Sequence, residues 1–69
     1  METIKIEDEY IKLGQALKLA GMAGSGVDAK FLIQDHMVYV NGVVEDRRGR
    51  KLRDGDIVTF DGESFQIKG

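Results

Sequence analysis

Apolar and polar positions along this chain change their period twice. Residues 3–7 alternate and place Ile4 and Ile6 on one face, which predicts a short strand. The period then becomes helical, and this stripe consists of Leu13, Ala16, Leu17 and Ala20. Gly21 follows the stripe and is suited to end a helix in the left-handed conformation.

A second helix is predicted after a short connector. Ser25, followed three residues later by Asp28, resembles a capping box, in which the serine side chain accepts a hydrogen bond from a free backbone amide. Val27 and Phe31 form an apolar pair on an adjoining face. The helix should end by Asp35, because strand-like alternation begins at residue 37. Its buried stripe is expected at Ala29, Leu32, Ile33 and His36.

The remainder of the chain has the pattern of a sheet. Asn41 and Gly42 lie between β-branched residues, which is the strongest short signal for a hairpin. Residues 57–60 and 64–68 are expected to pair around Asp61 and Gly62, after a turn at residues 54–56. This order predicts an α+β fold of one domain over residues 1–69, with two short helices packed on a small, mostly antiparallel sheet. The predicted core residues are Leu17, Leu32, Ile33, Val38, Val40 and Ile57.

Composition narrows the chemistry that the chain can perform. It has 69 residues, no cysteine and a single histidine, His36. Thiolate and nitrogen-rich metal sites are therefore not expected, and neither is another cofactor. No acid, base or nucleophile pattern surrounds His36, so we expect no catalysis. No segment is apolar for long enough to cross a membrane, and the first residues lack the features of a signal peptide, which predicts a cytoplasmic protein.

Basic residues are concentrated in residues 47–53, called the basic segment below. The net charge is −2, yet five of the ten Lys and Arg residues lie in this segment: Arg47, Arg48, Arg50, Lys51 and Arg53. Arginine binds phosphate oxygens in pairs, without a sequence code. We therefore expect a polyanion contact here, with side chains that are solvated and dispensable for the core. The alternative is a plain solvated loop, or one that pairs with Glu45, Asp46 and Asp54.

The glycine-rich connector before the second helix is another candidate site. Residues 24–29 fit the loose dinucleotide pattern G-x-G-x-x-A, but a helix precedes them where that pattern requires a strand. Residues 21–24 resemble the GXXG loop of KH domains, which sits in a domain with a further helix that this chain lacks. We favour a phosphate contact at the helix amides, made by Ser25, Gly26 and Lys30. Tyr39 is either a cross-strand packing residue or a platform for an unpaired base.

Residues 13–58 resemble the RNA-binding domain family named after bacterial small-subunit ribosomal protein four, also called the alpha-L motif. The family pattern is a helix with spaced leucines, a Gly-x-x-x-Ser turn, a second helix with a basic residue and Leu-Ile, then Val-x-Val-Asn-Gly and Gly-Asp-x-Val. The corresponding residues are Leu13, Leu17, Gly21, Ser25, Lys30, Leu32, Ile33, 38–42 and 55–58. The basic segment is similar to that of small stand-alone bacterial members. Larger members carry Arg where Gly26 stands, and Arg-Leu-Asp where this chain has Lys12, Leu13 and Gly14.

The resemblance implies a non-catalytic monomer that binds structured RNA, either ribosomal RNA or tRNA, in ribosome assembly or translation. Lys12 is expected to join the basic segment and the start of the second helix in this contact. A protein-interaction module whose basic loop meets an acidic partner is the rival hypothesis. DNA binding is less favoured, because no helix carries a row of basic residues suited to the major groove.

Overall fold

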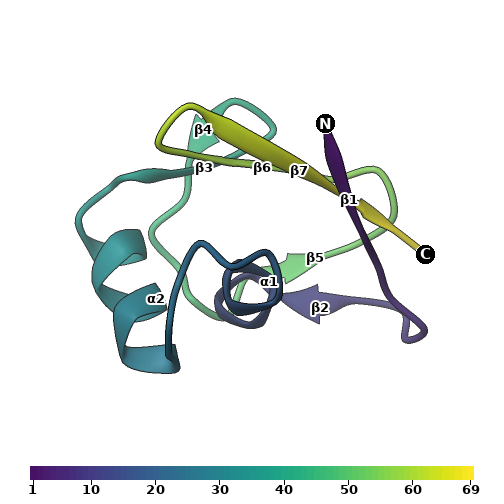
Figure 1. Cartoon of the computed structure of the whole chain (residues 1–69), viewed down its shortest axis with the longest axis horizontal. Coiled ribbons are helices and arrows are strands. Elements are labelled where there is room, and N and C mark those ends of the chain that lie inside the picture. Colours follow the sequence, from purple (N-terminus) through teal and green to yellow (C-terminus); the bar gives the residue numbers. More distant parts are fainter.

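Seven strands and two helices make up the structure, a computed structural model that describes residues 1–69. Five strands form one sheet in the order β1-β7-β6-β3-β4, and the other two form a separate ribbon, β2-β5. Both helices lie on one side of the sheet, and the ribbon lies beside α1 (Figure 1). The predicted α+β class is therefore confirmed. The bounds are β1 Glu2–Lys5, β2 Ile11–Lys12, α1 Leu13–Leu19, α2 Gly26–Gln34, β3 Val38–Val40, β4 Val43–Val44, β5 Lys51–Leu52, β6 Ile57–Phe60 and β7 Glu63–Lys68.

Both predicted helices are present and carry their predicted end signals. Gly21 has a φ of 76°, in the left-handed region that ends a helix. The Ser25 hydroxyl accepts a hydrogen bond from the Asp28 amide at 3.2 Å, which confirms the cap of α2. The α2 helix ends at Gln34, before Asp35. Neither helix has the length and apolar character that crossing a lipid bilayer would require.

The two predicted hairpin turns are also confirmed. Asn41 and Gly42 have φ values of 53° and 83°, and Asp61 and Gly62 have 53° and 77°. Both central residues of each turn therefore adopt the positive φ that two-residue hairpin loops require. The turns join β3 to β4 and β6 to β7 as antiparallel pairs, and β3 also pairs antiparallel with β6.

One cluster of 14 buried apolar residues lies between the sheet and the helices. Four predicted core residues belong to it, namely Leu17, Ile33, Val38 and Val40. Leu32 is half-buried and packs against this cluster, whereas Ile57 is half-buried without belonging to it, so the prediction for Ile57 is wrong. The reason is that side chains alternate along β6, so that Val58 points toward the helices and Ile57 points away from them. The core also extends beyond residues 13–58, to Ile6, Ile11, Phe65 and Ile67.

Two strand arrangements differ from the sequence prediction. The first strand covers Glu2–Lys5 rather than residues 3–7, and it pairs in parallel with β7. The second difference is the ribbon β2-β5, whose strands of two residues are too short to show any period. Lys51, expected in a loop, therefore lies in β5.

Candidate nucleic-acid interface

The carboxylate of Glu45 divides the basic segment into two sets of cations. Its side chain is only 7% exposed and accepts hydrogen bonds from the Arg47 amide, Nε and Nη2 at 3.0–3.1 Å and from Arg50 Nη1 at 2.8 Å. Hydrogen bonds from Arg47, and with a smaller effect from Arg50, lower the pKa of Glu45 from 4.5 to about 2 against the opposing effect of burial. Arg47 and Arg50 thus share one carboxylate, which offsets one of their two positive charges. The expectation that the whole segment is solvated is wrong for Arg50, whose side chain is two-thirds buried at 33% exposure.

The backbone of the basic segment is fixed against the start of α1. The amides of Leu13 and Gly14 donate to the carbonyls of Arg50 and Arg48 at 2.8 and 3.1 Å. These carbonyls serve as the cap of α1, because the N-cap residue Lys12 makes no side-chain cap. Gly14 also makes room for Arg48, since a Cβ at residue 14 would lie 2.8 Å from Arg48 Cγ. The absent side chain allows Arg48 to lie across the first turn of α1.

Three cations surround a polar hollow where α1, the start of α2 and the basic segment meet. We call it the cationic hollow, and its lining contains no apolar side chain and no carboxylate. The lining residues are Lys12, Gly14, Gln15, Lys18, Gly26 and Arg48. The ion pairs of the molecule join only Arg47 and Arg50 to Glu45, which leaves the three lining cations without an acidic partner. Gly26, the first residue of α2, adds a backbone amide that has no intrahelical acceptor, so the hollow suits an anion.

The β2-β5 ribbon continues this cationic surface. Ile11 and Leu52 are buried, while Lys12 and Lys51 are exposed and directly opposite each other. Like charges in this arrangement destabilise a strand pair, and a bound anion would remove that cost. Next to them, Lys51 Nζ lies 4.8 Å and Arg53 Cζ 5.6 Å from the centre of the Tyr10 ring. The ring thus gathers two cations that have no carboxylate partner.

The structure brings most of the predicted contact residues to one surface. Lys12, Gly26 and Arg48 line the cationic hollow. Lys51 and Arg53 lie beside it around Tyr10. Lys30 is exposed one helical turn after Gly26, and Arg47 and Arg50 border a shallow depression that also includes Lys51. The predicted set is therefore largely contiguous, although Arg47 and Arg50 carry a structural ion pair as well.

Two predicted contact residues are placed differently. Ser25 is exposed, but its hydroxyl is engaged in capping α2. Tyr39 lies on the opposite face of the sheet, because its neighbours Val38 and Val40 point toward the helices and alternate side chains face opposite ways. There Tyr39 pairs across the strands with Val44 and Thr59. The structure thus separates Tyr39 from the cationic hollow.

Sequence reasoning missed Gln15, Lys18 and Tyr10. Lys12, Gln15 and Lys18 recur every three residues on the side of α1 opposite its apolar stripe, and this polar face was the available signal. Tyr10 follows an acidic run and belongs to no periodic pattern of apolar residues, so the sequence gave no sign of its contacts with Lys51 and Arg53. No three His, Cys, Asp or Glu side chains are grouped as a metal site would need. The chemistry that this surface offers is electrostatic binding of phosphates.

Two helices on a small mixed sheet, with cations gathered where the helices meet, define the alpha-L class of small binding modules. The solution structure of YbcJ from Escherichia coli has this fold, at a TM-score of 0.77 and 36% identity over 100% of this chain and 89% of that chain. Its alpha-L motif is described as involved in RNA binding. The predicted fold is confirmed by this similarity.

The chain belongs to the S4 domain family, whose model matches residues 4–68. A Bacillus subtilis (strain 168) protein named "Probable ribosome maturation protein RlbA" is 49% identical over 65 residues, which are 93% of this chain and 92% of that protein. YbcJ of Escherichia coli (strain K12) is 40% identical over 58 residues, covering 84% of this chain and 83% of its own. The family resemblance found in residues 13–58 is confirmed and extends beyond them.

Proposed function

We propose that this chain is a non-catalytic, cytoplasmic RNA-binding protein that docks as a monomer on structured RNA. The observation that carries the proposal is the cationic hollow, where Lys12, Lys18 and Arg48 have no acidic partner and share the lining with Gly26 at the start of α2. Phosphates of a folded RNA fit such a surface whatever the base sequence. The net charge of −2 means that other faces are acidic, so RNA should bind in one orientation.

Ribosomal RNA is the target that we favour, with tRNA as the second. RlbA carries ribosome maturation in its name, and the solved YbcJ structure is described as RNA-binding. Double-stranded RNA offers its shape, phosphates and 2′-hydroxyls rather than a readable base code, which suits a rigid surface of cations and amides. A small module of this kind would act as a docking factor during assembly of a larger RNA particle.

The direct test compares two variants that lose the same charge. K12Q/K18Q removes two lysines from the cationic hollow, and K5Q/K68Q removes two exposed lysines from the β1-β7 pair. Fluorescence anisotropy with a ribosomal RNA fragment should show weaker binding for K12Q/K18Q alone. Its slope of log affinity against log salt should flatten by about 1.5, since each phosphate contact contributes about 0.7–0.9. Equal losses in both variants would mean unspecific attraction and would refute a site at the hollow.

Competition separates this function from its rivals. Structured RNA should displace the labelled fragment at far lower concentration than duplex DNA or an acidic protein of equal charge. Displacement by the acidic protein at the same concentration as RNA would instead favour a protein-interaction module. Size-exclusion chromatography with light scattering tests the monomer.

A further inference from the structure

The bend between β1 and β2 carries three carboxylates, those of Glu7, Asp8 and Glu9, and we call it the acidic bend. It borders the proposed RNA surface, although carboxylates do not help to bind phosphate. Asp8 and Glu9 line a hollow together with Tyr10, Lys12 and Gln15. We call this the tyrosine hollow. It is a hollow of about 420 Å³ that is open to solvent. Phosphate is a poor occupant, because two carboxylates would repel it.

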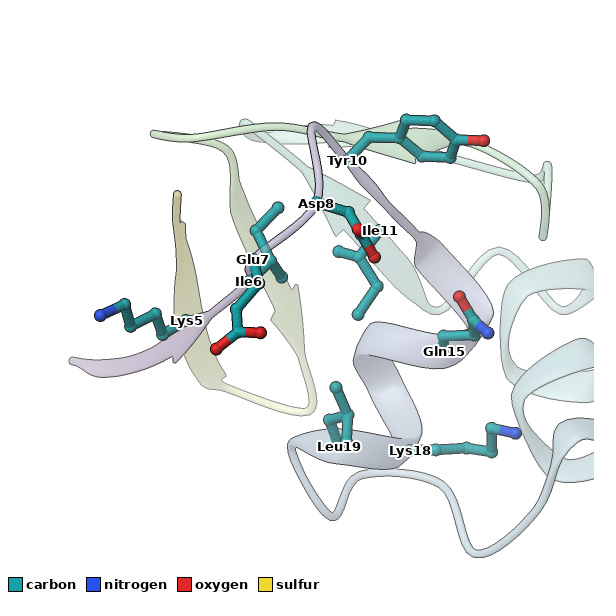
Figure 2. A pocket seen from close by; sticks show the side chains of 9 residues that line it. All are labelled: Lys5, Ile6, Glu7, Asp8, Tyr10, Ile11, Gln15, Lys18 and Leu19. Atoms are coloured by element: carbon teal, nitrogen blue, oxygen red, sulfur yellow. The ribbon is translucent and has the colours of Figure 1, made fainter.

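The tyrosine hollow adjoins the cationic hollow. Lys12 and Gln15 line both, so a nucleotide whose phosphate lies on Lys12 has its base within reach of Tyr10. Figure 2 shows the neighbouring pocket, which shares Asp8, Tyr10 and Gln15: the Tyr10 ring projects from the segment that leads into β2, the Asp8 carboxylate projects from the preceding bend toward Ile11 rather than toward the ring, and Gln15 extends from α1. The hollow therefore combines an aromatic ring, an amide and acceptor-only carboxylates beside a phosphate-binding cation.

We propose that the tyrosine hollow binds one unpaired nucleobase, guanine, next to the phosphates held in the cationic hollow. This inference rests on the RNA-binding function proposed above and adds a base preference to it. Unpaired bases stack on aromatic side chains. Lys51 and Arg53 lie over the Tyr10 ring, so a stacked base either takes the place of a cation or lies on the face that the cations leave free. Guanine presents two adjacent N–H donors on its Watson–Crick edge, which the carboxylates of Asp8 or Glu9 accept. Uracil has a single N–H between two carbonyl oxygens, and these oxygens would face a carboxylate unfavourably.

The binding test uses two RNA hairpins that differ only in one bulged guanosine. The parent protein should bind the bulged hairpin more tightly than the fully paired one. Y10L removes the ring and should reduce this preference at least about fivefold, the lower limit for stacking one base on an aromatic side chain. Y10F keeps the ring and should retain the preference. Thermal unfolding of Y10L verifies that it is folded, and the next two variants test the site without changing Tyr10.

Removal of the carboxylates gives a signature that charge alone cannot produce. D8N and E9Q each remove a repulsive charge, so binding to the fully paired hairpin should hold or strengthen. Their preference for a bulged guanosine over a bulged uridine should nevertheless fall. D46N is the matched control, because Asp46 is exposed beside the basic segment and has no ion pair. It should leave the guanosine preference unchanged.

Tyrosine fluorescence reports the base directly, since the chain has two tyrosines and no tryptophan. In Y39F the only tyrosine is Tyr10, and its emission should be quenched by the bulged-guanosine hairpin more than by the paired one. In Y10F the only tyrosine is Tyr39, on the opposite face of the sheet, and its emission should not distinguish the two hairpins.

The outcomes separate this inference from the function on which it rests. Equal binding of all hairpins without selective quenching of Tyr10 would overturn the guanine site and leave RNA binding intact. Tighter binding to a bulged uridine would also overturn it. Failure of the parent to bind any of these RNAs at low salt would overturn the proposed function and this inference together.

Discussion

The two sets of cations in the basic segment are equally charged in the sequence and unlike in the structure. Arg47 and Arg50 turn toward the buried carboxylate of Glu45, whereas Arg48 turns into the cationic hollow and has no acidic partner. Lys51 and Arg53 have no carboxylate either and lie at the Tyr10 ring. A run of basic residues is therefore not a measure of the charge available to a ligand.

The difference also suggests a division of labour. The pairs with Glu45 and the hydrogen bonds that the Arg48 and Arg50 carbonyls accept from the first amides of α1 fix the course of the backbone. A fixed backbone holds Arg48 in its place before any ligand arrives, which lowers the ordering cost of binding. Arg47 and Arg50 would then contribute to RNA binding indirectly, because they help to hold Arg48 in position.

Loss of the Glu45 carboxylate should have the largest effect on stability. E45A leaves the partly buried Arg50 without its partner and removes four hydrogen bonds. We expect the free energy of unfolding in urea to fall by about 2 kcal/mol, since charge-assisted hydrogen bonds are lost and solvent screens the exposed Arg47. D46N, at the exposed neighbouring acid, should change it by less than about 0.5 kcal/mol. An unchanged urea midpoint for E45A would show that the ion pairs do not hold the segment.

The same carboxylate predicts a pH dependence. Its pKa is about 2 in the folded protein and ordinarily 4.5, so the charged form stabilises the fold fully above about pH 4.5. This contribution is lost as the pH falls from 4.5 to 2. The difference in unfolding free energy between parent and E45Q should therefore shrink by up to about 2 kcal/mol over this range, a value reduced for the solvent exposure of Arg47. A constant difference from pH 7 to pH 2 would contradict the lowered pKa.

Single substitutions should separate the two sets of cations. R48Q should lower RNA affinity roughly tenfold with stability nearly unchanged, because one charge-assisted phosphate contact is lost. R50Q should show the opposite balance, with about 1 kcal/mol less stability and less than roughly threefold weaker binding. Urea unfolding and anisotropy titrations on the same samples measure both quantities. Equal losses of affinity would mean that Arg50 also contacts RNA.

G14A is expected to have the smallest effect. The added Cβ would lie 2.8 Å from Arg48 Cγ, so the Arg48 side chain must move aside. RNA affinity should fall roughly threefold, while stability should change by less than about 1 kcal/mol, since the higher helix propensity of alanine offsets the contact. A shifted Arg48 Nε resonance in NMR spectra would report the displacement. Unchanged RNA affinity together with a shifted resonance would show that RNA binding does not depend on this position of Arg48.

Much of the fold could be predicted because its signals are local. The stripe from Leu13, the cap at Ser25 and the two turns with glycine each specify a structure within a few residues, and each is confirmed. The β2-β5 ribbon could not be predicted, since each of its strands contributes a single buried residue and no period. The parallel partner of β1 lies at the far end of the chain, where local pattern carries no information.

The candidate site could be predicted in its charges but not in their pairing. The sequence shows every cation of the basic segment and three nearby carboxylates that could pair with them, Glu45, Asp46 and Asp54. Packing selects Glu45 for burial and so determines that Arg47 and Arg50 are the paired arginines. The position of Arg48 depends equally on a side chain that Gly14 lacks. Such contacts become visible only once the elements are assembled.

The parallel pairing of β1 with β7 also has a consequence for the speed of assembly. Glu2 meets Phe65 across about sixty residues of chain, whereas the helix pair and both hairpins close over short loops. Long closures are entropically costly, so β1 should join last and, as an edge strand with one neighbour, detach first. The acidic bend follows β1 directly and would loosen with it. Local detachment of β1 would then control the entry of a nucleobase into the tyrosine hollow, although no β1 side chain lines that hollow.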